Sequence, residues 1–156
     1  MLRLFTCIAL ISFSLSSNYA QKANKYLSGY WKGYITQGSL EATVGLPFEM
    51  YLEVKGYSVK GRTYVHQKNG EVIEMEVSGR LYSDNSLYLT EQQFIEREGS
   101  DVKPDHVKKY QFIYNRSIFE SDNSLDGYWQ EIIETPLALK RRRGKIVMKK
   151  GSAGKA

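Results

Sequence analysis

Hydrophobic and polar residues alternate with a period of two along most of the chain. Residues 48–54 read FEMYLEV and residues 73–77 read IEMEV, so their apolar side chains fall on one face. Side chains of a β-strand point alternately to opposite faces, whereas a helix would bring these polar residues onto its apolar side. The pattern therefore predicts strands with one buried and one solvated face. The solvated positions include four acidic residues: Glu49, Glu53, Glu74 and Glu76.

Turn-forming residues separate the alternating segments, and no segment has a convincing helical pattern. Gly56 follows one segment, Asn69-Gly70 lies between two others, and the cluster SDNS occurs at residues 83–86 and again at 121–124. Glycine and asparagine tolerate the positive φ angles of tight hairpin turns. These signals predict eight strands joined by short links, at residues 29–36, 48–54, 57–65, 73–77, 87–94, 109–114, 125–133 and 137–142.

Eight consecutive antiparallel strands leave two open sheet edges unless the sheet closes on itself. Open edges invite aggregation, and closure into a barrel pairs every strand. A barrel of about eight strands leaves room for side chains or for one small ligand. We therefore predict an all-β fold, an antiparallel up-and-down barrel of about eight strands, with a β-sandwich as the alternative.

Residues 1–20 have the pattern of a secretory signal peptide. Arg3 precedes an apolar run at residues 4–14, and small residues lead to Ala20. The run is shorter than a membrane span, which needs about 20 residues. We therefore expect export to the periplasm or the exterior of a Gram-negative bacterium, with a retained N-terminal anchor as the alternative. Cleavage also removes Cys7, the single cysteine, which excludes thiol catalysis, disulfides and thiolate metal sites.

Basic residues gather near the end of the chain. The formal net charge is +5, and residues 140–156 hold eight basic residues and no acidic one. We therefore divide the exported chain into a β-barrel domain at residues 21–143 and a basic C-terminal tail at residues 144–156. Such runs bind anionic surfaces or partners, although solvated tails are commoner. The candidate partner-binding residues are Lys140, Arg141, Arg142, Arg143, Lys145, Lys149 and Lys150.

The only two tryptophans lie in similar motifs, LSGYWK at residues 27–32 and LDGYWQ at residues 125–130. A tryptophan buries a large apolar area, so each is suited to plug one end of a barrel. The alternative is that a tryptophan stacks against a ligand, with tyrosines as the amphipathic walls of its pocket. The candidate ligand-binding residues are Trp31, Trp129, Tyr57 and Tyr110.

The motif Gly29-Tyr30-Trp31 at the start of the first predicted strand resembles the Gly-x-Trp signature of the lipocalins and the wider calycin group. Segments 59–64 (VKGRTY) and 77–82 (VSGRLY) look like the strand-centre glycines of avidin-type barrels, and the chain is similar to exported Bacteroidetes barrels of unassigned role. The resemblance implies a closed barrel with a binding role. It also implies that an Arg on a late strand packs over the Trp, and the residues that fit are Arg141, Arg142 and Arg143.

The sequence does not group the residue types that catalysis or metal binding requires. His66 and His106 are the only histidines, neither has a partner at metal-ligand spacing, and we interpret both as surface residues. No Gly-rich phosphate loop and no His-Glu-x-x-His motif occurs. We therefore predict no catalytic residue, no metal site and no cofactor, and we expect neither an enzyme nor a nucleic-acid-binding protein.

Two hypotheses of function remain. The first is an exported, non-enzymatic binding protein, a lipocalin-like barrel that holds a small apolar or amphipathic ligand. The second is an accessory interaction subunit of a bacterial cell-envelope or secretion complex, which docks partly through its basic C-terminal end.

Overall fold

The chain forms one closed barrel in the computed structural model, which describes residues 26–38, 40, 42, 44–99, 102–119, 122–133 and 141–151. The predicted all-β barrel is confirmed, and the sandwich alternative is excluded. The elements of the described part are eight strands: β1 (Gly29–Thr36), β2 (Gly45–Lys55), β3 (Ser58–His66), β4 (Val72–Leu81), β5 (Ser86–Ile95), β6 (Lys108–Asn115), β7 (Ser124–Glu131) and β8 (Arg143–Lys150).

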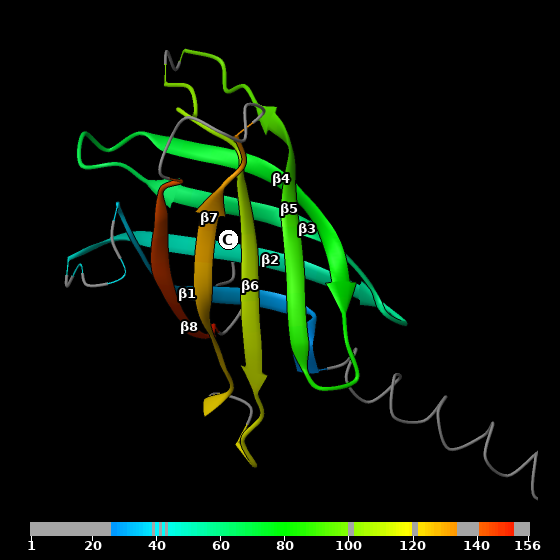
Figure 1. The fold of residues 1–156 in the computed structure, drawn as a ribbon. Helices are drawn as coiled ribbons and strands as arrows, with labels where there is room; N and C mark the ends of the chain where they lie inside the picture. Colours follow the sequence, from blue (N-terminus) through cyan, green and yellow to red (C-terminus); the bar gives the residue numbers. More distant parts are fainter. Residues whose placement is uncertain are drawn as a thin grey trace, which may run out of the picture.

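Each strand pairs antiparallel with the next one, and β8 returns to pair with β1. In Figure 1, β6, β7 and β8 cross in front of β1 and β2. The first and last strands pair with each other and so complete the barrel. Buried side chains from all eight strands fill the interior in one continuous apolar core.

The two ends of the barrel differ in the links that they carry. We call the end where β1 finishes and β2 begins the mouth, and the opposite end the base. The base carries links of two, four and eight residues, at 56–57, 82–85 and 116–123. The mouth carries links of eight, five, twelve and eleven residues, at 37–44, 67–71, 96–107 and 132–142. Long connections at one end of a rigid scaffold are where binding residues usually lie.

Two strand-centre glycines let neighbouring strands approach closely. A Cβ atom at Gly79 would lie 1.8 Å from the Tyr88 carbonyl oxygen, and one at Gly61 would lie 2.0 Å from the Tyr51 carbonyl oxygen. Both distances are far below van der Waals contact, so only glycine fits these positions. These are the glycines of the two avidin-like sequence segments.

The last strand lies later in the chain than we predicted from the sequence. We expected a strand at residues 137–142 and a basic tail from residue 144, but residues 143–150 form β8; residues 137–140 of the expected strand lie outside the described residues. Ile146 and Met148 point inward and are fully buried, whereas Lys145 and Lys149 point outward. The apolar residues inside this basic run therefore act as the inner face of a strand. The division at residue 143 was wrong, because residues 144–150 belong to the barrel.

The base is closed around the first tryptophan. The Trp31 indole Nε1 donates a hydrogen bond to the Leu27 carbonyl oxygen at 2.9 Å, and its ring meets the Tyr114 ring edge-on at 6.1 Å. Lys150 Nζ lies 4.8 Å from the centroid of the Trp31 ring and donates to the Tyr26 carbonyl oxygen at 2.8 Å. A cation therefore packs over this tryptophan, which is fully buried.

The cation over Trp31 is a lysine and not one of the three arginines that the resemblance suggested. β8 starts at Arg143 at the mouth and reaches the base only at Lys150. Arg142 and Arg143 therefore lie at the opposite end of the barrel from Trp31. The predicted signal peptide, residues 1–20, lies outside the described residues, and so does Lys140.

Candidate ligand site

A cavity of about 710 Å³ opens at the mouth of the barrel. This volume is within the range of about 300–1,000 Å³ that is usual for small-molecule pockets. Its apolar wall comes from the mouth ends of five strands and from the link before β6. The residues of this wall are Ile35, Leu46, Val65, Ile73, Val102 and Trp129.

Polar groups surround the same cavity. The charged and titratable ones are Lys68, Lys103, Asp105, His106, Lys108 and Arg142. They come from the links at 67–71, 96–107 and 132–142 and from the first residue of β6. The antiparallel order brings these three links to one end of the barrel, although they are far apart in sequence.

Trp129 is fixed at the inner side of the mouth. Its indole Nε1 donates a hydrogen bond to the Thr36 carbonyl oxygen at 2.7 Å, which ties the end of β7 to the end of β1. A Cβ atom at Gly144 would lie 2.4 Å from that nitrogen, so the glycine in β8 leaves the space that the indole needs. The ring stacks on His106, with centroids 5.4 Å apart and planes 25° apart.

His106 is held by a cluster of charges at the rim. Arg142 Nη2 lies 2.8 Å from His106 Nδ1, and the same guanidinium pairs with Glu131 at 3.2 Å and with Asp105 at 3.9 Å. Burial lowers the pKa of His106, and the nearby charges of Lys108 and Arg142 lower it further. The imidazole is therefore neutral near pH 7. We interpreted this histidine as a surface residue, but it is half-buried and lines the cavity.

The contacts of His106 fix its tautomer. An arginine guanidinium carries only donors, so Nδ1 must accept the hydrogen bond from Arg142. In a neutral imidazole the proton then sits on Nε2. Nε2 is buried and has no hydrogen-bond partner among the described residues. The mouth therefore contains one N–H donor that this part of the structure leaves unsatisfied.

An acidic residue lies inside the barrel below the mouth. Glu91 is buried, and its carboxylate accepts hydrogen bonds from the Tyr110 hydroxyl and, at 2.6 Å, from the Lys108 backbone N–H. Lys108 Nζ lies 3.8 Å from Glu91 Oε1. Burial raises the pKa of Glu91, and Lys108 and Tyr110 partly offset that rise. Burial and the neighbouring carboxylate raise the pKa of Tyr110, whose hydroxyl stays protonated.

The alternation along β5 explains why this acid is inside, because Glu91 follows the buried Leu87 and Leu89 on the same face. β5 pairs with β6 only over residues 86–90, and Glu91 then accepts the N–H of Lys108 at the start of β6. A β-bulge between Glu76 and Val77 of β4 and their β5 partners places Gln92 in an extra position. The side chain of Glu91 thus extends the bonding between β5 and β6 beyond the last paired residues.

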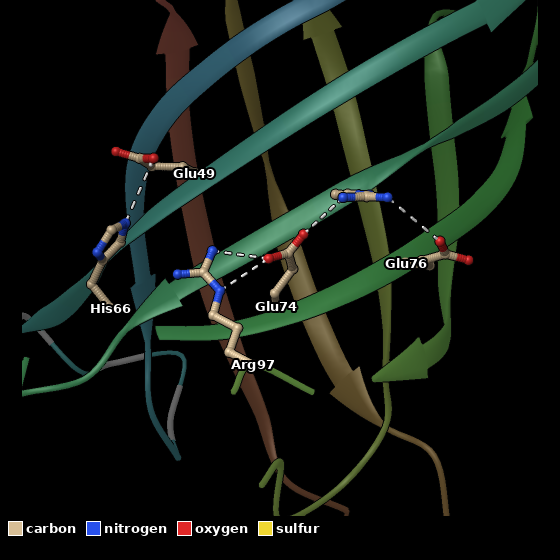
Figure 2. A network of polar contacts seen from close by, with 6 residues as sticks. Glu49, His66, Glu74, Glu76 and Arg97 are labelled. Carbon is tan, nitrogen blue, oxygen red and sulfur yellow. Dashed lines mark hydrogen bonds and ion pairs between the residues drawn. The ribbon is translucent and has the colours of Figure 1, made fainter. Parts of the chain in front are cut away.

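A second polar network lies on the outer face of β2, β3 and β4 and in the segment after β5, as Figure 2 shows. Glu74 Oε1 accepts from Arg62 at 3.1 Å, and Glu74 Oε2 accepts from Arg97 Nη2 at 2.9 Å. The Glu49 carboxylate lies 3.6 Å from His66 Nε2. We predicted that Glu74 is solvated, but its side chain is 8% exposed because the two arginines cover it. This network fastens the chain after β5 to the outer sheet and does not line the mouth cavity.

The structure separates the four candidate ligand-binding residues. Trp129 lines the mouth cavity, and Tyr110 lies buried beneath it with its hydroxyl bonded to Glu91. Trp31 lies at the base. Tyr57 lies in the exposed turn between β2 and β3, with Arg80 5.9 Å from its ring centroid. Of the four, only Trp129 lines this cavity.

The candidate partner-binding residues are also divided. Arg142 belongs to the charge cluster at the mouth, and Lys150 closes the base. Arg143, Lys145 and Lys149 share the outward face of β8, where they form a short basic stripe. Arg141 precedes the strand and is exposed.

No pattern in the sequence predicted that His106, Lys108 and Glu91 lie close together. Their proximity depends on residues 102–107 before β6, several of which line the mouth cavity, and on the Lys108 N–H that Glu91 accepts. Among the described residues, no three His, Cys, Asp or Glu side chains are grouped to hold a metal ion. The described part also has no helix long and apolar enough to cross a membrane.

Comparisons with protein-family models, curated proteins and solved structures give no match to this chain. The closed eight-stranded antiparallel barrel is consistent with a calycin-like fold. The barrel and the chemistry of its mouth are therefore the basis for assigning a role.

Proposed function

We propose that this chain is an exported, non-enzymatic binding protein, a lipocalin-like barrel that holds a small apolar or amphipathic ligand at its mouth. The observation that carries the proposal is the cavity of about 710 Å³ whose inner wall is apolar and whose rim is polar. Ligand pockets have this composition, with a few polar groups that orient a mostly apolar molecule. The Gly29-Tyr30-Trp31 signature and the cation packed over Trp31 support the lipocalin-like assignment.

Binding rather than catalysis is favoured by the state of the charged groups at the mouth. Arg142 is paired with Glu131, and Lys108 is next to Glu91, so these groups mainly hold the links and strands in place. Export is supported by residues 1–20, whose basic start, apolar core and small-residue exit suit a cleaved signal. Fractionation of a Gram-negative host that expresses the full chain tests this part, since retention in the cytoplasm would contradict it.

A cavity-blocking variant tests the binding site. Val102 contributes to the apolar wall, so Val102→Trp should fill part of the cavity and weaken binding of the apolar fluorescent probe N-phenyl-1-naphthylamine about tenfold. Val147→Trp is the matched control, because Val147 lies on the outer face of β8. Probe fluorescence titrations measure both. An unchanged affinity in Val102→Trp, or no probe binding to the parent chain, would contradict the mouth as the ligand site.

A second candidate function is an interaction subunit of an envelope complex that docks through the outer face of β8. The side chains of Arg143, Lys145 and Lys149 place three positive charges on the outer face of β8. Tyr34 of β1 and Tyr128 of β7 flank them and are 63% and 54% exposed. Cations next to exposed aromatic side chains are suited to an anionic partner surface.

A charge-matched comparison tests this second function. The variant Arg143→Gln/Lys145→Gln/Lys149→Gln should lose salt-sensitive partners that the parent recovers from the envelope fraction of the native host. The control Lys55→Gln/Lys60→Gln/Arg80→Gln removes the same charge from exposed positions on β2, β3 and β4. Equal recovery by the two variants would exclude a specific role of β8.

A further inference from the structure

The mouth cavity combines a buried apolar wall with an exposed cationic rim. Ile35, Leu46 and Val65 are 2%, 6% and 6% exposed, so they form the inner part of the wall. Lys68 and Lys103 line the same cavity and are exposed. A ligand that fills this space therefore meets apolar surface at its inner end and ammonium groups at its outer end.

The other charges of the lining are already compensated. Arg142 pairs with Glu131 and Asp105, and Lys108 lies next to Glu91. Among the described residues, Lys68 and Lys103 form no ion pair within 4.0 Å. These two lysines are thus the rim cations that remain available to a ligand.

The described residues of the interior offer no comparable position for a cationic ligand. Among the described residues Glu91 is the acid that points inward, but Tyr110 and Lys108 occupy both of its carboxylate oxygens. Asp105 is the acid that lines the cavity, and it faces Arg142. The acids of the outer network lie on the other side of the barrel wall.

His106 adds a hydrogen-bond donor that suits an anionic ligand. Its Nε2–H is unsatisfied in the described part, and its ring lines the cavity beside Trp129. A carboxylate accepts hydrogen bonds and does not donate any, so it can satisfy this N–H while it neutralises the rim lysines. An alcohol satisfies the N–H only, and a quaternary ammonium satisfies neither.

We propose that the mouth cavity selects amphipathic organic acids, with the apolar body against Ile35, Leu46 and Val65 and the carboxylate at Lys68, Lys103 and His106. This inference rests on the proposed binding function and names the class of its ligand. The selectivity comes from the rim, whereas the apolar wall accepts any chain of suitable width.

Three probes with the same alkyl chain test the selectivity: decanoate, decanol and decyltrimethylammonium. Isothermal titration calorimetry of the full exported chain, at low salt and near neutral pH, measures each affinity. Decanoate should bind about tenfold more tightly than decanol, because two partly exposed ion pairs supply modest attraction, and the ammonium should bind most weakly. Added salt should reduce this difference.

Variants locate the source of the preference. Lys68→Gln/Lys103→Gln should lower decanoate affinity to the level of decanol and leave decanol affinity unchanged. Lys55→Gln/Lys60→Gln removes the same charge from exposed positions of β2 and β3 and should leave both affinities unchanged. His106→Phe preserves a ring against Trp129 and removes the donor, so it should weaken decanoate and decanol alike, by about threefold, because both oxygens accept this hydrogen bond.

The outcomes separate this inference from the proposed function. Equal affinities for the three probes, or a decanoate preference that survives the Lys68→Gln/Lys103→Gln change, would overturn acid selectivity while binding at the mouth stands. Failure of all three probes to bind, together with failure of the apolar fluorescent probe, would overturn both.

Discussion

Glu91 illustrates how one buried acid organises its surroundings. Its carboxylate accepts hydrogen bonds from the Tyr110 hydroxyl, which is buried, and from the Lys108 N–H, which is half-buried, so both donors depend on it. A donor that loses its acceptor inside a protein keeps its desolvation cost without compensation. Glu91 therefore holds the start of β6 in place and also satisfies a hydroxyl group inside the barrel.

Glu91→Ala should lower the free energy of unfolding by about 3 kcal/mol, because a buried donor and a half-buried donor lose their acceptor. Glu96→Ala, at an exposed position just after β5, should change it by no more than about 0.5 kcal/mol. Urea denaturation of both variants measures the difference. Equal stability of the two would show that the Glu91 hydrogen bonds do not hold β6.

The pH dependence of stability follows from the raised pKa of Glu91. The folded protein binds the Glu91 proton more tightly than the unfolded chain, so this group favours folding most when it is protonated. Its contribution weakens as pH rises from about 4.3, the usual glutamate value, through the raised pKa. The stability of the parent relative to Glu91→Gln should therefore decrease over that range. Denaturation at a series of pH values measures this, and an increase would contradict the assignment.

At the scale of elements, β8 completes the barrel and also carries its basic stripe. It pairs with β7 over residues 143–149 and with β1 over residues 146–150. Its inward residues belong to the core, and its outward residues are mostly lysine and arginine. The eight residues of β8 thus close the sheet and also give one side of the barrel a positive charge.

Neighbouring substitutions in β8 test its place in the barrel. Ile146→Ala should lower the free energy of unfolding by about 3 kcal/mol, because a fully buried side chain is truncated. Val147→Ala, one residue later and 39% exposed, should cost about 0.5 kcal/mol. Thermal and urea denaturation measure the pair. Similar small losses at both positions would mean that this segment is not a strand of the core.

Period-two patterning was sufficient to predict the first seven strands to within a few residues. β8 was placed too early because a run of lysine and arginine at residues 140–150 resembles a solvated tail. Ile146 and Met148 show that this segment is a strand, because both point into the barrel. Their role becomes clear only when β1 and β7 each need a neighbouring strand to pair with. Pairing with a distant strand is not encoded in local alternation.

The site was less predictable than the fold. Trp129 was a candidate from its motif, but His106 reaches it from the link before β6. Burial of Glu74 depends on Arg97, which approaches from a different element. Each of these contacts joins segments whose separation in sequence hides their proximity, so no spacing rule identifies them.

At the scale of the whole molecule, the two tryptophans lie at opposite ends of the barrel and have different structural roles. The prediction that each closes one end is confirmed for Trp31 at the base, where Leu27 and Lys150 cover it. Trp129 lies at the mouth and borders the cavity. The barrel is therefore closed at the base and hollowed at the mouth.

Single tryptophan variants should separate stability from binding. Trp31→Phe and Trp129→Phe should each lower the free energy of unfolding by about 2 kcal/mol, because each loses a buried indole hydrogen bond and part of its packing. Only Trp129→Phe should also weaken the binding of N-phenyl-1-naphthylamine, by about threefold. Denaturation and probe titration measure the two quantities. A loss of affinity in Trp31→Phe equal to that in Trp129→Phe would contradict the separate roles of the two ends.

The seam between β1 and β8 also sets an order of events for folding. Lys150 bonds the carbonyl of Tyr26 across 124 positions of the chain, and Gly151 bonds the carbonyl of Tyr30. Contacts of such long range form slowly, because the entropy of a large loop is lost before they contribute. Until β8 arrives, β1 and β7 each present an unpaired edge to other chains. The sheet thus remains vulnerable to misassembly until its last strand is in place.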